Sequence, residues 1–300
     1  MSINSEQVIR TEKKVFREGL STRKRKNTKS LSIWLSHIAL VFVSFVTLFP
    51  IALMVINSFK SNADITSNPL ALPSDIAWSN FSNAWNYAHF SSTIPNSIMV
   101  ALYTISIVLV LATPLAWVLA RKLVRSWQMI MLWLMAVMTV PSQLFMFVLY
   151  FTYAELNILN NQLSLALIYA VTQIPFATFI LRTYFAAIPV ELEESAQIEG
   201  ASPWQVLRRV LIPMVAPGLL TVSLIVGLGA WNEFLLSSIF MQGTEKSSAI
   251  VAFFSLQGTY GNDSGILMAG AMILIAPVIF FFVLLQKRFV EGLVGGSVKG

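Results

Sequence analysis

Few side chains in this sequence have the chemistry to catalyse a reaction or to bind a metal. The chain has no cysteine and only two histidines, His37 and His89. This excludes thiolate catalysis, disulfides and a histidine-rich metal site. The glycine pair in Val294-Gly295-Gly296-Ser297 is too short to form the glycine-rich loop that cradles nucleotide phosphates, and it lacks the required lysine. We therefore expect no catalytic residue, no metal and no cofactor in this chain.

Carboxylates are the remaining groups of interest, and they gather in residues 182–214. Pro189 suits the first position of a helix, and acidic residues after it favour the positive end of the helix dipole. Gly200 can take the left-handed conformation that ends a helix. Ser202 and Gln205 then form a capping box that begins another. The sequence predicts two short helices joined at Gly200. The acidic residues of this segment are Glu191, Glu193, Glu194 and Glu199.

This elbow has two interpretations. It could dock onto another protein, or it could be an amphipathic connector that lies on lipid. Its acidic first arm favours docking, because anionic headgroups would repel it.

The elements that position the elbow are predicted to be membrane-spanning helices. The sequence is 56% apolar and 11% charged, against roughly 45–50% and about 25% in soluble domains. A spanning helix needs about 17–25 apolar residues, and six charge-free blocks are long enough. The spans are expected at about 33–56, 97–120, 127–150, 163–181, 215–239 and 266–285. The prolines inside them, expected as tolerated kinks or as lining of a pathway, are Pro50, Pro114, Pro141, Pro175 and Pro277.

Lysine and arginine fix the expected orientation of these spans. Of the 20 basic residues, 18 lie in the N-terminal tail, the 121–126 loop, the 182–214 segment and the C-terminal tail. The positive-inside rule then places both termini in the cytoplasm. Since topology accounts for the basic charge, we expect no nucleic-acid partner and no cleaved signal. The expected divisions are a basic tail at 1–30, a transmembrane domain at 31–286 and a C-terminal tail at 287–300.

The elbow also carries a family resemblance. Glu194-Ser195-Ala196, Gly200 and the run 210–213 resemble the EAA–G–I-x-L-P motif of binding-protein-dependent ABC importer permeases, with matching spacing. Ser195 stands where alanine is usual, and Glu199 where aspartate is usual. Other segments resemble the carbohydrate branch, especially the shorter permease of maltose-type importers. They are Ser58-Phe59-Lys60, Asn96-Ser97, Trp231-Asn232-Glu233 and the ending from Phe289 to Gly300.

The resemblance implies a type I ABC importer permease fold, all-α with six transmembrane helices. In that family two permease subunits form the pore, two ATPase subunits bind ATP and Mg, and an extracytoplasmic binding protein delivers the solute. The loop at 240–265 matches one that reaches into the binding protein. The residues that would couple to the ATPase are Glu194, Ser195, Ala196, Glu199, Gly200 and Pro213, and Gly296, Lys299 and Gly300 of the tail are further candidates.

Polar residues within the expected spans are candidates for the solute pathway or its gate. Glu233 is the only charged residue in any span, and it lies near the exterior end of the fifth. A helix-packing hydrogen bond is the alternative role for each candidate. They are Gln143, Tyr169, Gln173, Asn232 and Glu233, and Tyr103 and Thr104 are further polar or aromatic residues within the spans.

The sequence is thus interpreted as a permease subunit of an ATP-driven importer of a di- or oligosaccharide, embedded in the cell membrane. Glycerol phosphate or another sugar-derived solute is the alternative cargo. An ion-coupled transporter that acts alone would need charges within the membrane, and a membrane-embedded enzyme would need paired carboxylates or histidine there. Within the expected spans the only charged residue is Glu233, and the only histidine is His37, near the cytoplasmic end of the first span.

Overall fold

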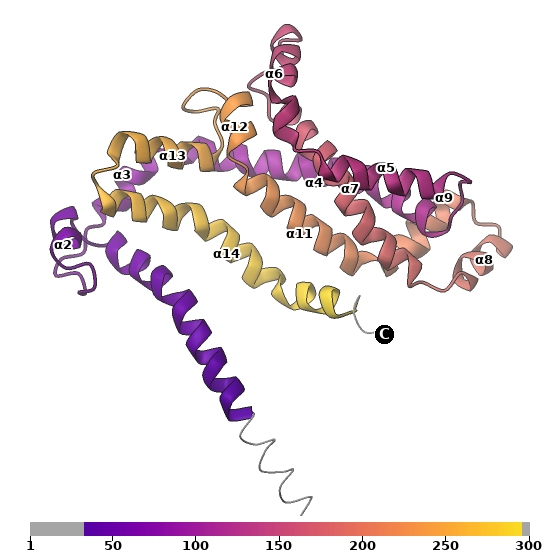
Figure 1. Cartoon of the computed structure of the whole chain (residues 1–300), viewed down its shortest axis with the longest axis horizontal. Coiled ribbons are helices and arrows are strands. Elements are labelled where there is room, and N and C mark those ends of the chain that lie inside the picture. The colour runs from indigo at the N-terminus through magenta and orange to yellow at the C-terminus, as the bar shows by residue number, and fades with distance from the viewer. Residues whose placement is uncertain (1–32, 296–300) are drawn as a thin grey trace, which may run out of the picture. The chain divides into compact units, whose positions relative to one another are not determined.

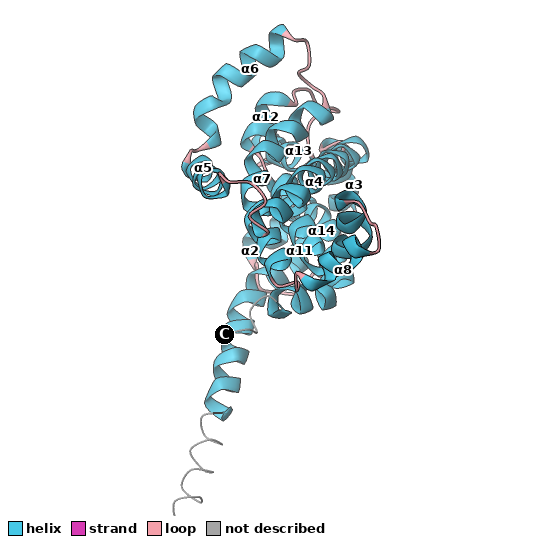
Figure 2. Cartoon of the chain, turned by 90° about the vertical axis from the view of Figure 1, so that its right-hand side faces the viewer, coloured by secondary structure: helices cyan, strands magenta, loops and turns pink. Residues whose placement is uncertain are grey.

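The structure, a computed structural model, describes residues 33–295. These residues form helices joined by turns and loops, with no strand among them (Figure 2). The all-α fold class is thereby confirmed. The chain divides into two units, Met1–Ile56 and Asn57–Gly300, and each is described by itself.

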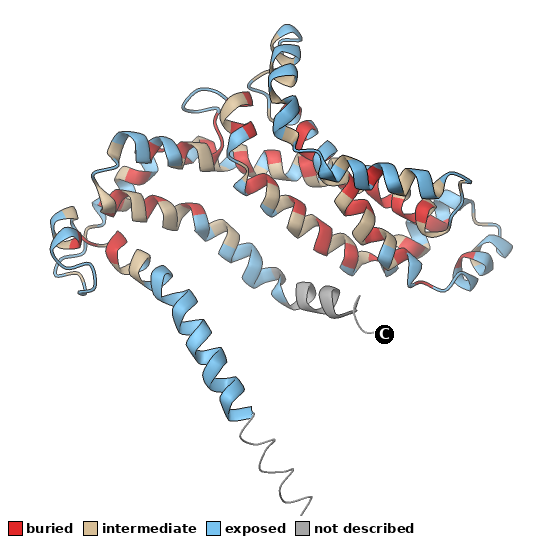
Figure 3. Cartoon of the chain, viewed as in Figure 1, coloured by how far each residue is buried: buried red, intermediate tan, exposed pale blue. Residues whose placement is uncertain are grey.

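The described part of the first unit belongs to one long helix, Ile33–Ser58, which continues into the second unit. Pro50 lies inside this helix without ending it. Apolar side chains are exposed all around it, among them Trp34 and Val41 (Figure 3). A helix of 26 residues that is apolar on every side suits a lipid environment and is long enough to cross a bilayer.

Three helices form the centre of the second unit: α4 (Phe90–Ala120), α7 (Gln162–Ala186) and α11 (Ala216–Asn232). The contact between α4 and α7 is the most extensive in the structure, and α11 packs against both (Figure 1). Small side chains let membrane helices approach closely. The buried small residues in this core include Ala112, Ala116, Ala170 and Ala177.

Short helices gather at the two ends of this unit, as Figure 1 shows. One end, called the elbow end below, carries α8 (Glu191–Ile198) and α9 (Pro203–Val206). The opposite end carries α2 (Asn62–Ser67), α3 (Ser79–Tyr87) and α13 (Ala249–Tyr260), and α12 (Leu235–Phe240) lies between the two ends, above α11 in Figure 1. The last helix, α14 (Ser264–Gly295), packs against α3, α11 and α13.

Four unbroken helices are long and apolar enough to cross a membrane, and six spans result if two bent pairs each count as one. One bent pair is α5 (Trp127–Thr139) with the residues from Ser142 to Glu155, at 80°. These comprise the 3-10 turn η1 (Ser142–Phe145) and α6 (Met146–Glu155). The helix expected at 127–150 is therefore broken at Pro141 and not merely kinked, and its two parts make one span only if the bent pair is counted together.

Proline explains this break. Pro141 has no backbone N–H to donate and disfavours a helical conformation at the residue before it. Val140 is accordingly extended, with ψ 119°, and α5 ends at Thr139. By contrast, Pro114, Pro175 and Pro277 lie inside α4, α7 and α14, where they are tolerated as predicted.

The expected span at 215–239 is also not one helix. α11 ends at Asn232, Glu233 is extended with ψ 113°, and α12 begins at Leu235. At its other end, α11 is bent by 77° from the helical segment Pro203–Met214. That segment contains α9, the π-helical turn η2 (Leu207–Leu211) and α10 (Ile212–Met214).

Candidate functional site

The first arm of the elbow is α8, at the end of the bundle where α4 and α7 terminate (Figure 1). Glu191, Glu193 and Glu194 occupy its first turn, where their charges favour the positive end of the helix dipole. The N–H groups of Glu193 and Glu194 donate to the carbonyl of Val190, which closes the first turn. The first turn of α8 is thus closed by backbone bonds and carries three negative charges.

Gly200 forms the corner of the elbow, as predicted. Its φ is +88°, the left-handed conformation that favours glycine. The N–H of the next residue, Ala201, donates to the carbonyl of Ala196 at 3.0 Å, so the chain closes off α8 as it turns. The predicted capping box is also present: Ser202 N–H donates to Gln205 Oε1 at 2.7 Å, and Gln205 N–H to Ser202 Oγ at 3.4 Å.

The outer surface of the elbow combines carboxylates with bare apolar side chains. Glu194 and Glu199 are exposed. Ile198 is 87% exposed and Trp204 is 62% exposed. Two large apolar side chains thus stand open on the elbow together with two carboxylates. We call these four residues the elbow face.

The other residues of the predicted coupling motif are bonded or packed within the chain itself. Ser195 is exposed, but its hydroxyl donates to the carbonyl of Glu191 at 2.7 Å. Ala196 packs against the buried core at this end. Pro213 lies in α10, directly after the π-helical turn and just before the bend into α11. The motif thus contains exposed residues and residues that hold the elbow in place.

The inner side of α8 carries a buried acid whose pairing the sequence analysis missed. Glu193 is only 5% exposed. Its Oε1 accepts a hydrogen bond from Arg121 Nε at 2.6 Å, and its Oε2 accepts one from Trp117 Nε1 at 3.0 Å. Helical spacing can place Glu193 on an inner face, but it cannot identify partners more than 70 positions away.

The candidate pathway residues separate into a connected pair and scattered members. Tyr169 donates its hydroxyl to Glu233 Oε2 at 2.8 Å. Gln173 lies beside Gly229 of α11, where an added Cβ would be 3.1 Å from its Nε2. Asn232 donates to the carbonyl of Leu228 within its own helix. Gln143 is exposed in η1 and takes no part in these contacts. Thr104 is buried and donates to the carbonyl of Val100 in its own helix.

Glu233 holds a helix junction. Besides the bond from Tyr169, its carboxylate accepts the N–H groups of Leu236 and Ser237 at 3.1 and 3.0 Å, and so caps α12. The same side chain therefore ties α12 to α7 at the point where α11 ends. Three donors thus share its two carboxylate oxygens.

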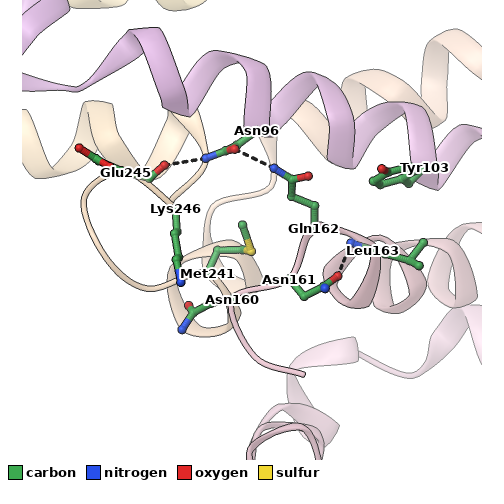
Figure 4. Close-up of a pocket in the computed structure, with 9 residues that line it drawn as sticks. All are labelled: Asn96, Tyr103, Asn160, Asn161, Gln162, Leu163, Met241, Glu245 and Lys246. Carbon is green, nitrogen blue, oxygen red and sulfur yellow. Dashed lines mark hydrogen bonds between the residues drawn. The ribbon is translucent and has the colours of Figure 1, made fainter. Parts of the chain in front are cut away.

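A polar pocket of about 440 Å³ lies toward the opposite end (Figure 4). Its wall is tied together by amides: Asn96 Nδ2 donates to the carbonyl of Glu245 at 2.8 Å, and Gln162 Nε2 donates to Asn96 Oδ1 at 2.7 Å. Asn160 Oδ1 also accepts the N–H of Gln242 at 2.6 Å. The lining residues are Asn96, Tyr103, Asn160, Asn161, Gln162, Leu163, Met241, Glu245 and Lys246.

Two further expectations concern ligands and the tail. Among residues 33–284, the structure has no group of three or more His, Asp or Glu residues that could hold a metal. The candidate tail residues Gly296, Lys299 and Gly300 lie outside the described residues.

Comparison with known proteins gives a family match. Residues 112–294 match the family described as "Binding-protein-dependent transport system inner membrane component". The chain is 32% identical over 270 residues to the diacetylchitobiose uptake system permease protein DasC of Streptomyces coelicolor, covering 89% of this chain and 97% of that one. It is 26% identical to the arabinooligosaccharides transport system permease protein AraQ of Halalkalibacterium halodurans, covering 92% and 100%.

A solved structure shows the same fold. The chain superimposes with a TM-score of 0.71 on a chain of a bacterial ABC transporter involved in the import of the acidic polysaccharide alginate. The match covers 85% of this chain and 95% of that one, at 23% identity.

Proposed function

The chain belongs to the family of binding-protein-dependent transport system inner membrane components, and from this premise we propose that it forms half of the translocation pathway of an ATP-driven sugar importer. A second permease subunit supplies the other half. Two separate ATPase subunits bind ATP with Mg and dock at the elbow end, on the cytoplasmic side. A binding protein outside the membrane delivers a di- or oligosaccharide to the opposite end.

The observation that carries this proposal is the elbow face. Ile198 and Trp204 expose large apolar surfaces beside Glu194 and Glu199, at an end of the bundle that also contains the 121–126 loop. Burial of Ile198 and Trp204 in a partner would stabilise the complex by roughly 1.5–3 kcal/mol per side chain. The carboxylates would orient that partner if its cleft were basic. The two arms are set at a fixed angle by Gly200 and by the capping box.

The proposed cargo rests on the relatives and on the polar pocket. DasC and AraQ are named for a disaccharide and for oligosaccharides, and the superimposable transporter imports a polysaccharide. The pocket at the opposite end is lined mainly by amide and charged groups (Figure 4), which suits a hydroxyl-rich solute or a hydrophilic loop of a binding protein. Glycerol phosphate and other sugar-derived solutes are the alternative cargo.

Transport coupled to an ion gradient is disfavoured by Glu233. It is the only charged residue within the predicted spans, and its carboxylate already accepts hydrogen bonds from Tyr169, Leu236 and Ser237. An ion-coupled carrier would need charged groups free to bind and release the ion.

The test is to isolate the complex and to disrupt its elbow face. The tagged chain, purified from its host membrane, should co-purify with an ATPase subunit and a second permease. Glu194→Lys should reduce the amount of ATPase per permease, because it reverses a charge on the docking surface. Gln197→Ala, an exposed neighbour outside the elbow face, is the matched control. Transport by the isolated chain under a proton or sodium gradient, with no ATPase bound, would contradict the proposal.

A further inference from the structure

The buried acid of α8 is unusual in this molecule. Glu193 and Arg121 form the only ion pair among residues 33–284, and their side chains are 7% and 9% exposed. The other acids of α8, Glu191 and Glu194, are exposed. A buried carboxylate is costly unless its charge is paired and its oxygens are hydrogen-bonded. Glu193 meets both conditions, so we asked what this arrangement does that an apolar residue would not.

The bonds around Glu193 are directional and reach a single partner helix. Its two oxygens accept from Arg121 Nε and from Trp117 Nε1, which lie one turn apart at the end of α4. Arg121 Nη2 also donates to the carbonyl of Ile188 at 2.9 Å, in the segment that leads into α8. We call Trp117, Arg121 and Glu193 the α4–α8 strut. It fixes both the position and the rotation of α8 against α4.

Stability alone is a poor explanation for such a strut. A well-packed apolar pair commonly stabilises a protein as much as a buried ion pair does, because the charges must be desolvated. An apolar contact has no preferred direction, so the two helices can slide or rotate against each other without losing it. The three hydrogen bonds made by Arg121 and Trp117 have fixed geometry and would break under such movement.

Apart from the strut, α8 has few contacts that would prevent it from tilting. At its C-terminal end α8 meets Gly200, whose left-handed conformation makes a turn, and at its N-terminal end it follows the short segment after α7. Ala196 contributes only a small apolar contact with the core. Without the strut, α8 could tilt about its two ends while α4 stayed in place.

We propose that Glu193 is a positioning residue, and that the α4–α8 strut makes α4 follow every movement of α8. This rests on the proposed function, in which an ATPase moves α8. Because α4 packs along α7 more extensively than any other helix pair, movement delivered to α4 also carries α7. The inner face of α8 thus transmits the movement that its outer face receives.

Distance measurements between α8 and α4 test this proposal directly. The chain has no native cysteine, so spin labels can be placed at two exposed sites, Glu191 of α8 and Val110 of α4. Pulsed electron paramagnetic resonance then gives the distance distribution in the purified complex, nucleotide-free and with ATP, Mg and vanadate. The doubly labelled chain is compared with the same chain carrying Glu193→Gln, Arg121→Gln or both, and with Gln197→Ala as the control.

In the labelled chain with an intact strut, we expect the same distance distribution between the two labels with and without nucleotide. In Glu193→Gln and in Arg121→Gln, nucleotide should shift the distribution by more than its width, because α8 moves with the ATPase and α4 lags. In the double variant, nucleotide should shift the distance distribution no further than in either single variant, because both substitutions break the same Arg121–Glu193 pair. Gln197→Ala should behave as the parent does.

A residue that served stability alone would lower the yield of complex and leave the distance independent of nucleotide. That result, or additive shifts in the double variant, would overturn the strut. If a single variant fails to assemble, Arg121→Leu with Glu193→Leu removes both charges and keeps the site apolar, and it must show the same nucleotide-dependent shift. A parent chain that retains no ATPase would instead contradict the proposed function itself.

Discussion

Replacement of Gly200 isolates the effect of backbone conformation at the corner of the elbow. The residue has φ +88°, and a Cβ built on it meets no atom within 4 Å. Any substitution there has room for its side chain. The cost therefore comes from the left-handed conformation and not from a clash. This makes a graded series of substitutions informative.

The magnitudes follow from the residue types. A left-handed conformation costs an ordinary residue such as alanine roughly 1–2 kcal/mol, and asparagine less, because its short polar side chain can hydrogen-bond locally. Valine is β-branched and should cost more than alanine. Since one to two kcal/mol is a factor of about 5–30 in an equilibrium, Gly200→Ala should noticeably depopulate the native elbow. Gly200→Asn should do so least and Gly200→Val most.

The assay is the amount of ATPase subunit retained per permease in the complex purified through the tagged chain. Retention of the ATPase should be highest in the parent chain and should fall from Gly200→Asn to Gly200→Ala to Gly200→Val. The amount of permease in the membrane should stay constant. Gly243→Ala is the matched control, because Gly243 has φ +100° and equally open surroundings but lies at the opposite end. Full retention in Gly200→Val, or a loss in Gly243→Ala as large as in Gly200→Ala, would refute the reasoning.

Two further predictions concern topology and packing. Cysteine placed at Thr244 should react with a membrane-impermeant thiol reagent in intact cells and cysteine at Ser195 should not, although both positions are exposed; the reverse pattern would invert the proposed orientation. Gly218→Ala should lower the melting temperature of the purified chain, because its Cβ would lie 2.6 Å from the ring of Tyr184 and overpacking costs about 1–3 kcal/mol. Gly258→Ala should not lower the melting temperature, because a Cβ there has no atom within 4 Å. Equal melting temperatures for the two variants would contradict the prediction and show that α7 and α11 move apart at little cost.

Local features of the elbow could be predicted from the sequence, because their causes are local. Gly200 and the Ser202–Gln205 capping box depend on backbone groups within a few residues of each other, and both are present as expected. The long apolar helices follow from composition and length alone. The resemblance to the family motif assigns the proposed coupling residues to this elbow, but it did not separate exposed Glu194 from core-facing Ala196.

Tertiary packing decided the rest. Pro175 is buried within α7 and the helix continues through it, whereas Val140 and Pro141 are both exposed and the helix ends there. Burial alone does not decide the outcome, because Pro50 is exposed and yet lies inside an unbroken helix. The partner of Glu193 could not be predicted either, because Arg121 lies 72 positions away and many basic residues share that side of the expected topology.

The amide at position 96 also sets the order in which the molecule is completed during synthesis. Asn96 and Ser97 bond to groups 149 and 152 positions later, at Glu245 and Ala249. At about 5–20 residues per second, a ribosome needs roughly 7–30 s to supply those partners. The core at the elbow end needs nothing beyond Val226. A growing chain can therefore assemble that core first, and the wall of the polar pocket is complete only once Glu245 and Lys246 have been added.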